Sequence, residues 1–216
     1  MDTTGFAKGQ VVTGFSFPIV AKYVNNNGTI TYTDGMDLAR GIDVDPQIET
    51  ANENNTLWAN NRAAEEGQRK FRRGTLNLGV DGLLITAEKL IMGIPSAAAN
   101  TVSVGQATVA FTSYGNDQNI PYVGVGFVVQ SQSNGVVFYR AFVYRKLRFA
   151  QFDVPAATEG EDIDWQTQQL SATILVDDTA RGDWKWFSEP LGTELEAYNA
   201  ARAALDMETA AALPVT

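Results

Sequence analysis

The chain has 216 residues, is 44% hydrophobic and 19% charged, and carries a formal net charge of −9. These values are typical of a globular domain and exclude an intrinsically disordered chain, which combines low hydrophobicity with high charge. Cysteine and histidine are both absent, which excludes disulfides, cysteine- or histidine-bound metals, and hydrolases that use a Ser-His-Asp or Cys-His arrangement. Three alternatives are left: carboxylate chemistry, an oxygen-ligated metal, or no chemistry at all.

The length fits one domain over residues 1–216. No stretch approaches the roughly 20 apolar residues of a membrane-spanning helix, so we expect no membrane association. The first ten residues, MDTTGFAKGQ, lack the basic and apolar regions of a secretory signal. We therefore expect the chain to be made and folded in a cytoplasm.

The N-terminal third predicts strands. Residues 15–33 contain two apolar runs separated by Asn27-Gly28, a pair that is typical of a tight β-hairpin turn. In residues 41–50, apolar and acidic side chains alternate, which predicts a half-buried strand with an acidic outer face. Pro46 lacks a backbone N–H, so this strand should lie at a sheet edge.

A long excursion between strands follows at residues 51–74, rich in Asn and without a sustained period, with a short helix expected at 63–66. Residues 75–80 alternate as a strand. Residues 81–95 predict a helix that Gly93 and Pro95 terminate. The apolar stripe of that helix consists of Leu83, Ala87, Leu90 and Ile91.

Residues 120–149 predict a second long hairpin, which turns at Asn134-Gly135. Its strands carry apolar side chains on both faces, so we expect a helix or a neighbouring molecule to cover each face. Gly124 and Gly126 inside a strand indicate close backbone approach. Further strands are expected near 165–178 and 183–189. A C-terminal helix at 193–208 begins with a capping box formed by Thr193 and Glu196.

The basic cluster GQRKFRRG, residues 67–74, stands out on an acidic chain. If the alternation of residues 75–80 continues backwards, Lys70 and Arg72 lie on the apolar face, and Phe71 lies on the other face with the remaining basic residues. Charges on both faces cannot all be buried, so this strand end should extend beyond the sheet as an arm. The net charge argues against DNA binding. The alternatives left are a solvated strand tip and pairing with an acidic neighbour.

The acidic segment EGEDID, residues 159–164, is one candidate mate for this arm. A solvated loop is the simpler interpretation, and a calcium site is disfavoured because the spacing of a calcium loop is missing. Carboxylates elsewhere could in principle form a glycosidase pair, but surface acids explain them equally well. These carboxylates are Asp43, Asp45, Asp177 and Asp178.

Aromatic residues near the C-terminus allow a second function. Trp184, Trp186 and Phe187, with Trp165, could form a platform on which sugar rings stack. Core and interface packing is the simpler interpretation, because large aromatic side chains dominate protein cores.

Taken together and in this order, several segments resemble the major tail proteins, or tail tube proteins, of long-tailed, non-contractile bacteriophages (siphophages). No single segment is a sharp motif, but their order is specific, and the resemblance spans roughly residues 14 to 205. The segments are NNNGTITYTDGMDLARGIDVDPQIETANENNTLWANNRAAEE, GTLNLGVDGLLITAEKLIMG, VGVGFVVQSQSNGVVFYRAFVYRKLRF, EDIDWQTQQLSATI, DWKWF and ELEA.

The resemblance implies a mainly β fold with flanking α, a β-sandwich or barrel-like subunit that joins others in hexameric rings. Such rings stack into the tail tube of the virion, which delivers DNA without binding it specifically. The expected partners are other copies of the chain, the tape measure protein, and the tail terminator and distal tail proteins. Assembly would take place in the cytoplasm of the bacterial host. The family has no catalytic residues, cofactor or metal, so we expect no enzyme activity.

In the family, the long excursion reaches a neighbouring subunit or ring, which maps here onto residues 51–74. A carbohydrate-binding β-sandwich and a tube protein of a contractile tail or secretion system are the alternative functions. The candidate interface residues are Trp58, Arg62, Arg69, Lys70, Phe71, Arg72, Arg73, Glu159, Glu161, Asp162 and Asp164.

Overall fold

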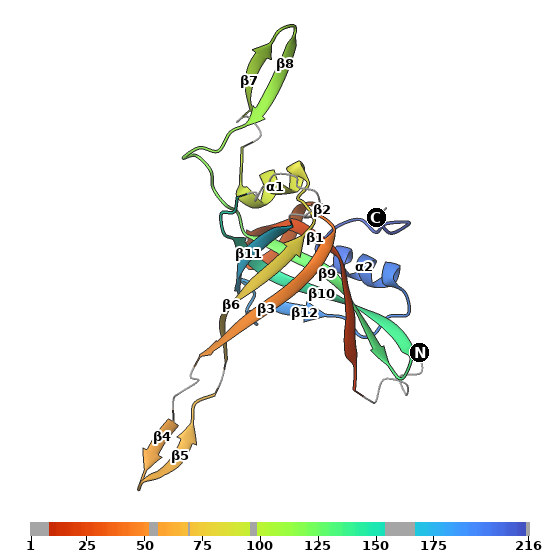
Figure 1. Ribbon diagram of the computed structural model, residues 1–216. Helices are drawn as coiled ribbons and strands as arrows, with labels where there is room; N and C mark the ends of the chain where they lie inside the picture. Colours follow the sequence, from red (N-terminus) through yellow and green to blue (C-terminus); the bar gives the residue numbers. More distant parts are fainter. Residues whose placement is uncertain (1–8, 52–55, 69, 96–98, 154–166, 215–216) are drawn as a thin grey trace, which may run out of the picture.

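Antiparallel strands make up most of the protein, and two helices lie against them (Figure 1). The computed structural model describes residues 9–51, 56–68, 70–95, 99–153 and 167–214. Over these ranges the fold is mainly β with flanking α, which confirms the predicted fold class. The elements are β1 (Val11–Asn26), β2 (Thr29–Asp37), β3 (Gly41–Ala51), β4 (Thr56–Ala59), β5 (Arg62–Glu66), β6 (Lys70–Val80), α1 (Ile85–Met92), β7 (Ala99–Val104), β8 (Ala107–Thr112), β9 (Val123–Ser133), β10 (Val136–Phe149), β11 (Gln168–Leu175), β12 (Lys185–Phe187) and α2 (Glu194–Ala203).

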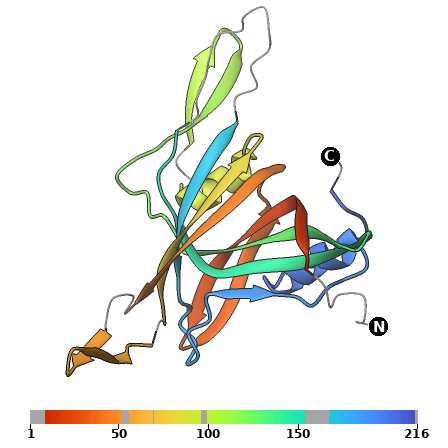
Figure 2. The ribbon, with the colours of Figure 1, turned by 60° about the horizontal axis from the view of Figure 1, so that its bottom comes forward.

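One large sheet forms the body. Its strands lie in the order β2-β1-β9-β10-β11-β6-β3, and β12 pairs with β10. The edge position of β3 confirms the prediction from Pro46. The sheet curls, because β3 and β1 are far apart in the strand order and yet in contact (Figure 2). At this contact the Phe15 ring lies so close to Gly41 that a Cβ there would be 2.2 Å from it.

Both long hairpins turn where the sequence predicts. Asn27 and Gly28 have φ angles of 53° and 89°, and Asn134 and Gly135 have φ angles of 51° and 81°. Two consecutive positive φ angles define the turn that matches the right-handed twist of paired strands. These four residues therefore fix the register of β1 with β2 and of β9 with β10.

Two apolar cores lie on opposite faces of β9 and β10. One core contains alternate residues of β9, such as Val125 and Phe127, and is closed at one end by Ile91 of α1. The other contains Val128 and is covered by Tyr198 of α2. The apolar residues on both strand faces are thus covered within one subunit: α2 covers one face, as expected, while strands β6 and β11 of the curled sheet cover most of the other, which neither predicted alternative included. A neighbouring molecule is not needed to explain them.

Local sequence signals mark the end of α1 and the start of α2. Gly93 terminates α1 with a left-handed φ of 63°, as predicted. The capping box of Thr193 and Glu196 begins α2, also as predicted. The predicted end of the C-terminal helix at residue 208 is wrong, since α2 ends at Ala203. The chain then turns back, with Asp206 at φ 52°, and the N–H of Met207 donates to the Arg202 carbonyl.

Gly124 is a position where a side chain does not fit. We expect Gly124→Ala to lower the free energy of unfolding by about 1–3 kcal/mol, because the new methyl group would lie 2.5 Å from both Tyr32 and Leu205. Gly82→Ala is the control, since no atom lies within 4 Å of its Cβ position. Urea unfolding followed by tryptophan fluorescence measures both variants. A Gly124→Ala midpoint equal to that of the wild type would contradict the close approach.

Candidate assembly surfaces

Two hairpins project from opposite ends of the body (Figures 1 and 2). We call the β4-β5 hairpin the first arm and the β7-β8 hairpin the second arm. Within the described ranges, each forms its own two-stranded sheet, separate from the large one. An isolated two-stranded hairpin is marginally stable in water, so a surface that covers these arms would stabilise them.

The first arm carries two of the predicted interface residues near its tip. Trp58 is 68% exposed, and Arg62 is exposed and forms no ion pair with any described residue. The short helix expected at 63–66 is wrong, because these residues form β5. Asn60 and Asn61, with φ angles of 52° and 60°, make a tight turn. Pairing with β4 then overrides the helix propensity of Ala and Glu.

The basic cluster forms the start of β6. Its residues extend past β11, which pairs only from Gly74 onward, but they stay paired with β3 as far as Lys70. The strand end therefore leaves the large sheet as a two-stranded ribbon, not as the single arm that was predicted. Lys70 and Arg72 are exposed there.

Arg73 has a partner in its own chain. Its Nε donates to Glu49 Oε2 at 2.6 Å across the β3-β6 ribbon, and both side chains are largely exposed. This hydrogen bond from Arg73 lowers the pKa of the Glu49 carboxyl. Arg73 therefore already has a carboxylate partner within its own subunit, and the predicted pairing with another subunit is not required.

Phe71 lies on the opposite face from the one predicted. The register between β3 and β6 shifts between Arg73 and Phe71, so Arg72 is an extra residue in β6. A one-residue bulge reverses the side-chain alternation. Phe71 consequently turns inward and stacks on Trp184, with ring centroids 4.4 Å apart and an interplanar angle of 5°. The half-buried Phe71 therefore packs the end of the β3-β6 ribbon against the body, and its role at an interface stays a prediction.

Arg69 and the acidic residues proposed as a mate lie outside the described residues. The latter are Glu159, Glu161, Asp162 and Asp164. The predicted pairing between the basic and acidic segments stays a prediction.

The second arm was not predicted. Its sequence does carry a signal, because small and β-branched residues alternate on either side of Gly105, which has a φ of 63°. The register pairs Val102 with Val109 and Asn100 with Phe111, which places their side chains on one face. Phe111 is 52% exposed, and the described residues 100–112 are all exposed.

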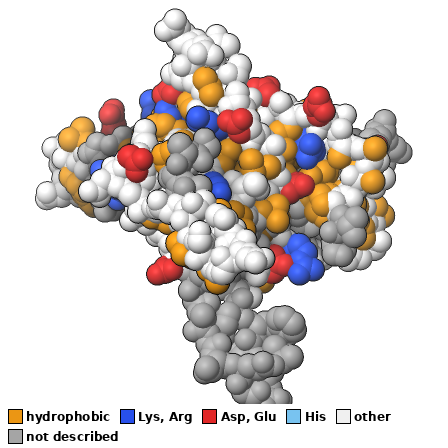
Figure 3. Space-filling model, turned by 90° about the horizontal axis from the view of Figure 1, so that it is seen from above, with side chains coloured by type: hydrophobic (Ala, Val, Ile, Leu, Met, Phe, Trp, Pro, Cys, Tyr) orange, Lys and Arg blue, Asp and Glu red, His pale blue; other side chains and the backbone are white. Residues whose placement is uncertain are grey.

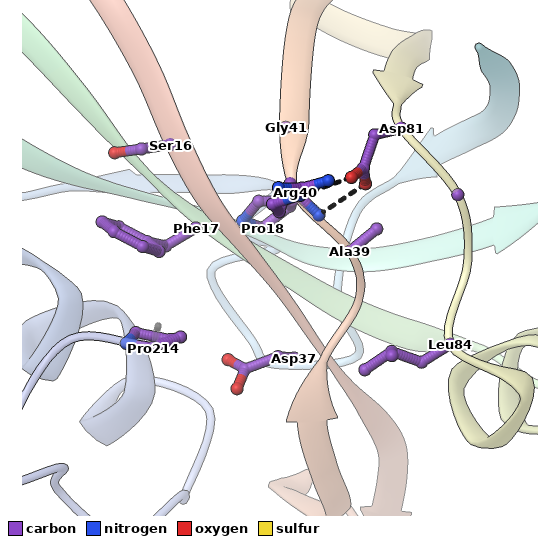
Figure 4. Close-up of a pocket in the computed structure, with 11 residues that line it drawn as sticks. Ser16, Phe17, Pro18, Asp37, Ala39, Arg40, Gly41, Asp81, Leu84 and Pro214 are labelled. Carbon is purple, nitrogen blue, oxygen red and sulfur yellow. Dashed lines mark hydrogen bonds and ion pairs between the residues drawn. The ribbon is translucent and has the colours of Figure 1, made fainter. Parts of the chain in front are cut away.

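A cleft of about 500 Å³ lies between β1, the link from β2 to β3, and the start of α1 (Figure 4). Arg40 and Asp81 form an ion pair at its edge, and Asp37 accepts a hydrogen bond from Tyr198. Burial and then this contact with Asp37 raise the pKa of Tyr198 to about 12. Arg40, Asp81 and Asp37 are therefore engaged in holding elements together, and the hydroxyl of Ser16, on the cleft wall, donates to Glu194 Oε1 at 2.6 Å.

The tryptophans proposed as a sugar platform are engaged in packing. Trp184 stacks on Phe71, and the Arg145 guanidinium lies 3.7 Å from the ring centroid of Trp186. Trp165 is not among the described residues. The contact of Trp184 agrees with the packing interpretation, whereas Trp186 is 42% exposed and Phe187 is 62% exposed, so the sugar platform stays a prediction.

Charged and apolar side chains are intermixed on the face seen from above (Figure 3). Among the described residues, no group of three or more acidic side chains could hold a metal ion. None of the helices in the described ranges is long and apolar enough to span a membrane.

A scan against protein-family models finds none that matches the chain, and a search of curated proteins finds no significant match.

Proposed function

We propose that this chain is a structural virion protein, a subunit that self-assembles into stacked hexameric rings and forms the tail tube of a long-tailed bacteriophage. The observation that carries the proposal is the pair of arms at opposite ends of the body, each with large apolar side chains exposed. Exposed apolar patches are typical of surfaces that another molecule covers. A subunit with one such arm at each end suits head-to-tail association, which generates filaments when it does not close.

One face of the sheet suits a channel for DNA. Along β3, β6 and β11, the side chains that point away from the core are acidic or uncharged from Asp43 to Gln47, from Thr75 onward in β6 and throughout β11. The basic residues Lys70, Arg72 and Arg73 lie at the end of the β3-β6 ribbon, where Glu49 pairs with Arg73. Fixed negative charge repels DNA phosphates, and short polar side chains offer no base-stacking platform. We assign this face to the lumen. Its residues are Asp43, Asp45, Gln47, Glu49, Thr75, Asn77, Gln169, Ser171 and Thr173.

In this proposal the protein has no enzyme activity and no cofactor. Its other contacts in the virion are with the tape measure protein inside the tube and with the terminator and distal tail proteins at its ends. DNA passes through the tube without specific binding, which agrees with the net charge of −9.

Sedimentation velocity over a wide range of protein concentrations tests the proposal. We expect the 23.4 kDa chain to shift from small species to large assemblies as concentration rises. A chain that sediments as a monomer throughout, at both low and moderate salt, would contradict the proposed function.

The basic strand end provides a test of the assembly surface. We expect Arg72→Glu combined with Arg73→Glu to weaken assembly while the subunit stays folded, because both side chains are exposed and the local charge reverses. Arg73→Glu alone also places a second carboxylate opposite Glu49, so each single variant is measured separately. Arg181→Glu, at an exposed loop position, is the control.

Pelleting of assemblies at several salt concentrations reports the effect. Since surface charges are screened by salt, the difference between variant and wild type should shrink as salt rises. Wild-type yields from the double variant at every salt concentration would exclude a role for this strand end in assembly.

A further inference from the structure

The second arm presents an apolar face that the described part of its own chain leaves uncovered. Val102, Val104, Val109 and Phe111 share this face and are all exposed. The arm's sequence, ANTVSVGQATVAFT, contains no charged residue, although the whole chain has a net charge of −9. A second acidic copy can therefore approach this face without like-charge repulsion.

An acidic cleft lies at the base of the second arm. It has a volume of about 390 Å³ and is lined by Glu88 of α1 and by Tyr114 and Asp153. The Tyr114 hydroxyl donates a hydrogen bond to Glu88. Burial raises the pKa of Tyr114 to about 12, and the nearby carboxylates of Glu88 and Asp153 add to the effect. Negative charge is thus concentrated where the second arm joins the body.

The first arm carries apolar side chains and one cation near its tip, and its acidic residues Glu65 and Glu66 lie nearer its base. Leu57 and Trp58 are exposed apolar side chains, and Arg62 follows directly after the turn at the arm's tip. At about 3.3 Å per residue, strands of four to six residues in the two arms extend over roughly 13–20 Å. If the arms lie side by side and point in opposite directions, the tip of one meets the base of the other. Arg62 then lies at the acidic cleft, and Trp58 lies on the apolar face.

We propose that the apolar face of the second arm and the acidic cleft at its base are the receptor for the first arm of a second copy. The inference rests on the proposed function and names the contact that joins one ring to the next. Because the two arms project from opposite ends of one subunit (Figures 1 and 2), each copy donates at one end and receives at the other. Such a contact is heterologous, and it extends into a filament.

Cysteine cross-linking tests the contact. Because the chain contains no cysteine, no native thiol can form a competing disulfide. A tagged Trp58→Cys chain is mixed with an untagged Val109→Cys chain under mild oxidation, and the tag distinguishes mixed dimers from homodimers. We expect at least about ten times more mixed dimer than from Trp58→Cys with Val136→Cys. Val136 is equally apolar and is 52% exposed, against 42% for Val109, but it lies at the turn of the β9-β10 hairpin. Equal yields from the two mixtures would overturn the proposal.

Charge reversal tests the electrostatic part. We expect Arg62→Glu to weaken stacking about tenfold and leave the rings intact, and Glu88→Lys to do the same. Combining the two substitutions should restore tubes, since the charge pair is rebuilt in the opposite sense. Thermal unfolding controls for the loss of the Tyr114 contact in Glu88→Lys. Failure of the combination to recover stacking, when all three variants are folded, would count against the pairing of these two residues.

The outcomes separate this inference from the proposed function. If wild-type protein forms tubes but Trp58→Cys and Val109→Cys do not cross-link within them, the receptor is elsewhere and only this inference fails. If wild-type protein forms neither rings nor tubes, the proposed function fails. Tubes that require Arg62 and show the specific cross-link support both.

Discussion

Asp177→Ala is expected to lower the free energy of unfolding by about 3–5 kcal/mol, because it removes one partner from a buried ion pair. Arg145 Nε donates to Asp177 Oδ2 at 2.9 Å, and the two side chains are only 7% and 0% exposed. Asp177 also accepts hydrogen bonds from the Thr179 hydroxyl and from the backbone N–H of Asp183. The substitution would leave the Arg145 charge buried under Trp186 without a carboxylate.

Arg181→Ala is the matched control, because the ion pair of Arg181 with Asp183 lies in the same region and its guanidinium group is 85% exposed. We expect a change of less than about 1 kcal/mol for this surface pair. Urea unfolding monitored by tryptophan fluorescence compares the two variants. A similar, small change in both would contradict the assigned role of the buried pair.

The same pair predicts a pH dependence. Burial alone would raise the pKa of Asp177, but the hydrogen bonds from Thr179 and Arg145 outweigh it and lower the pKa below its usual value. A carboxyl whose pKa is lower in the folded state stabilises the fold above its unfolded pKa of about 3.9 and loses this effect as pH falls through the folded pKa. The stability difference between wild type and Asp177→Ala should therefore shrink below about pH 4. A constant difference from pH 7 to pH 3 would contradict this explanation.

Removal of the first arm is expected to abolish tube formation and leave the body folded. In this variant a short Gly-Ser linker replaces residues 56–66, which form a two-stranded sheet separate from the large one. Since the body's two cores contain no residue of this arm, we expect the unfolding midpoint to change by no more than about 2–4 °C, equivalent to roughly 1 kcal/mol. Electron microscopy reports tubes, and differential scanning calorimetry reports the midpoint.

Asn61→Gly is the control for arm removal. An Asn-Gly pair keeps the two positive φ angles of the turn, so the arm and the tubes should both persist. Normal tubes from the linker variant would show that the first arm is dispensable and would contradict its assignment as an assembly element.

Local signals explain which parts of the fold were predictable. The Asn-Gly turns, the terminating Gly93 and the capping box of Thr193 and Glu196 each act within a few residues, and all of them form as predicted. Two of the errors involve contacts between distant segments. Phe71 turns inward because of a bulge opposite β3, and Arg73 finds Glu49, 24 residues away, across the same pairing.

The candidate site was predictable in part for the same reason. The sequence placed Trp58 and Arg62 in an arm, but it could not show that Ala63 and Glu65 extend as a strand, because their helix propensity is high and only pairing with β4 overrides it. The second arm was overlooked although Val102 and Val104 alternate with polar residues. The second arm lies at the end of the body opposite the first arm. This position depends on the three-dimensional arrangement of the body, and no local sequence signal predicts it.

Negative-stain electron microscopy of the concentrated, purified protein tests the central claim most directly. We predict rings and tubes of uniform width, formed by this chain alone. A field of separate, monomer-sized particles under conditions in which the protein is folded would contradict the claim that the chain is a self-assembling tube subunit.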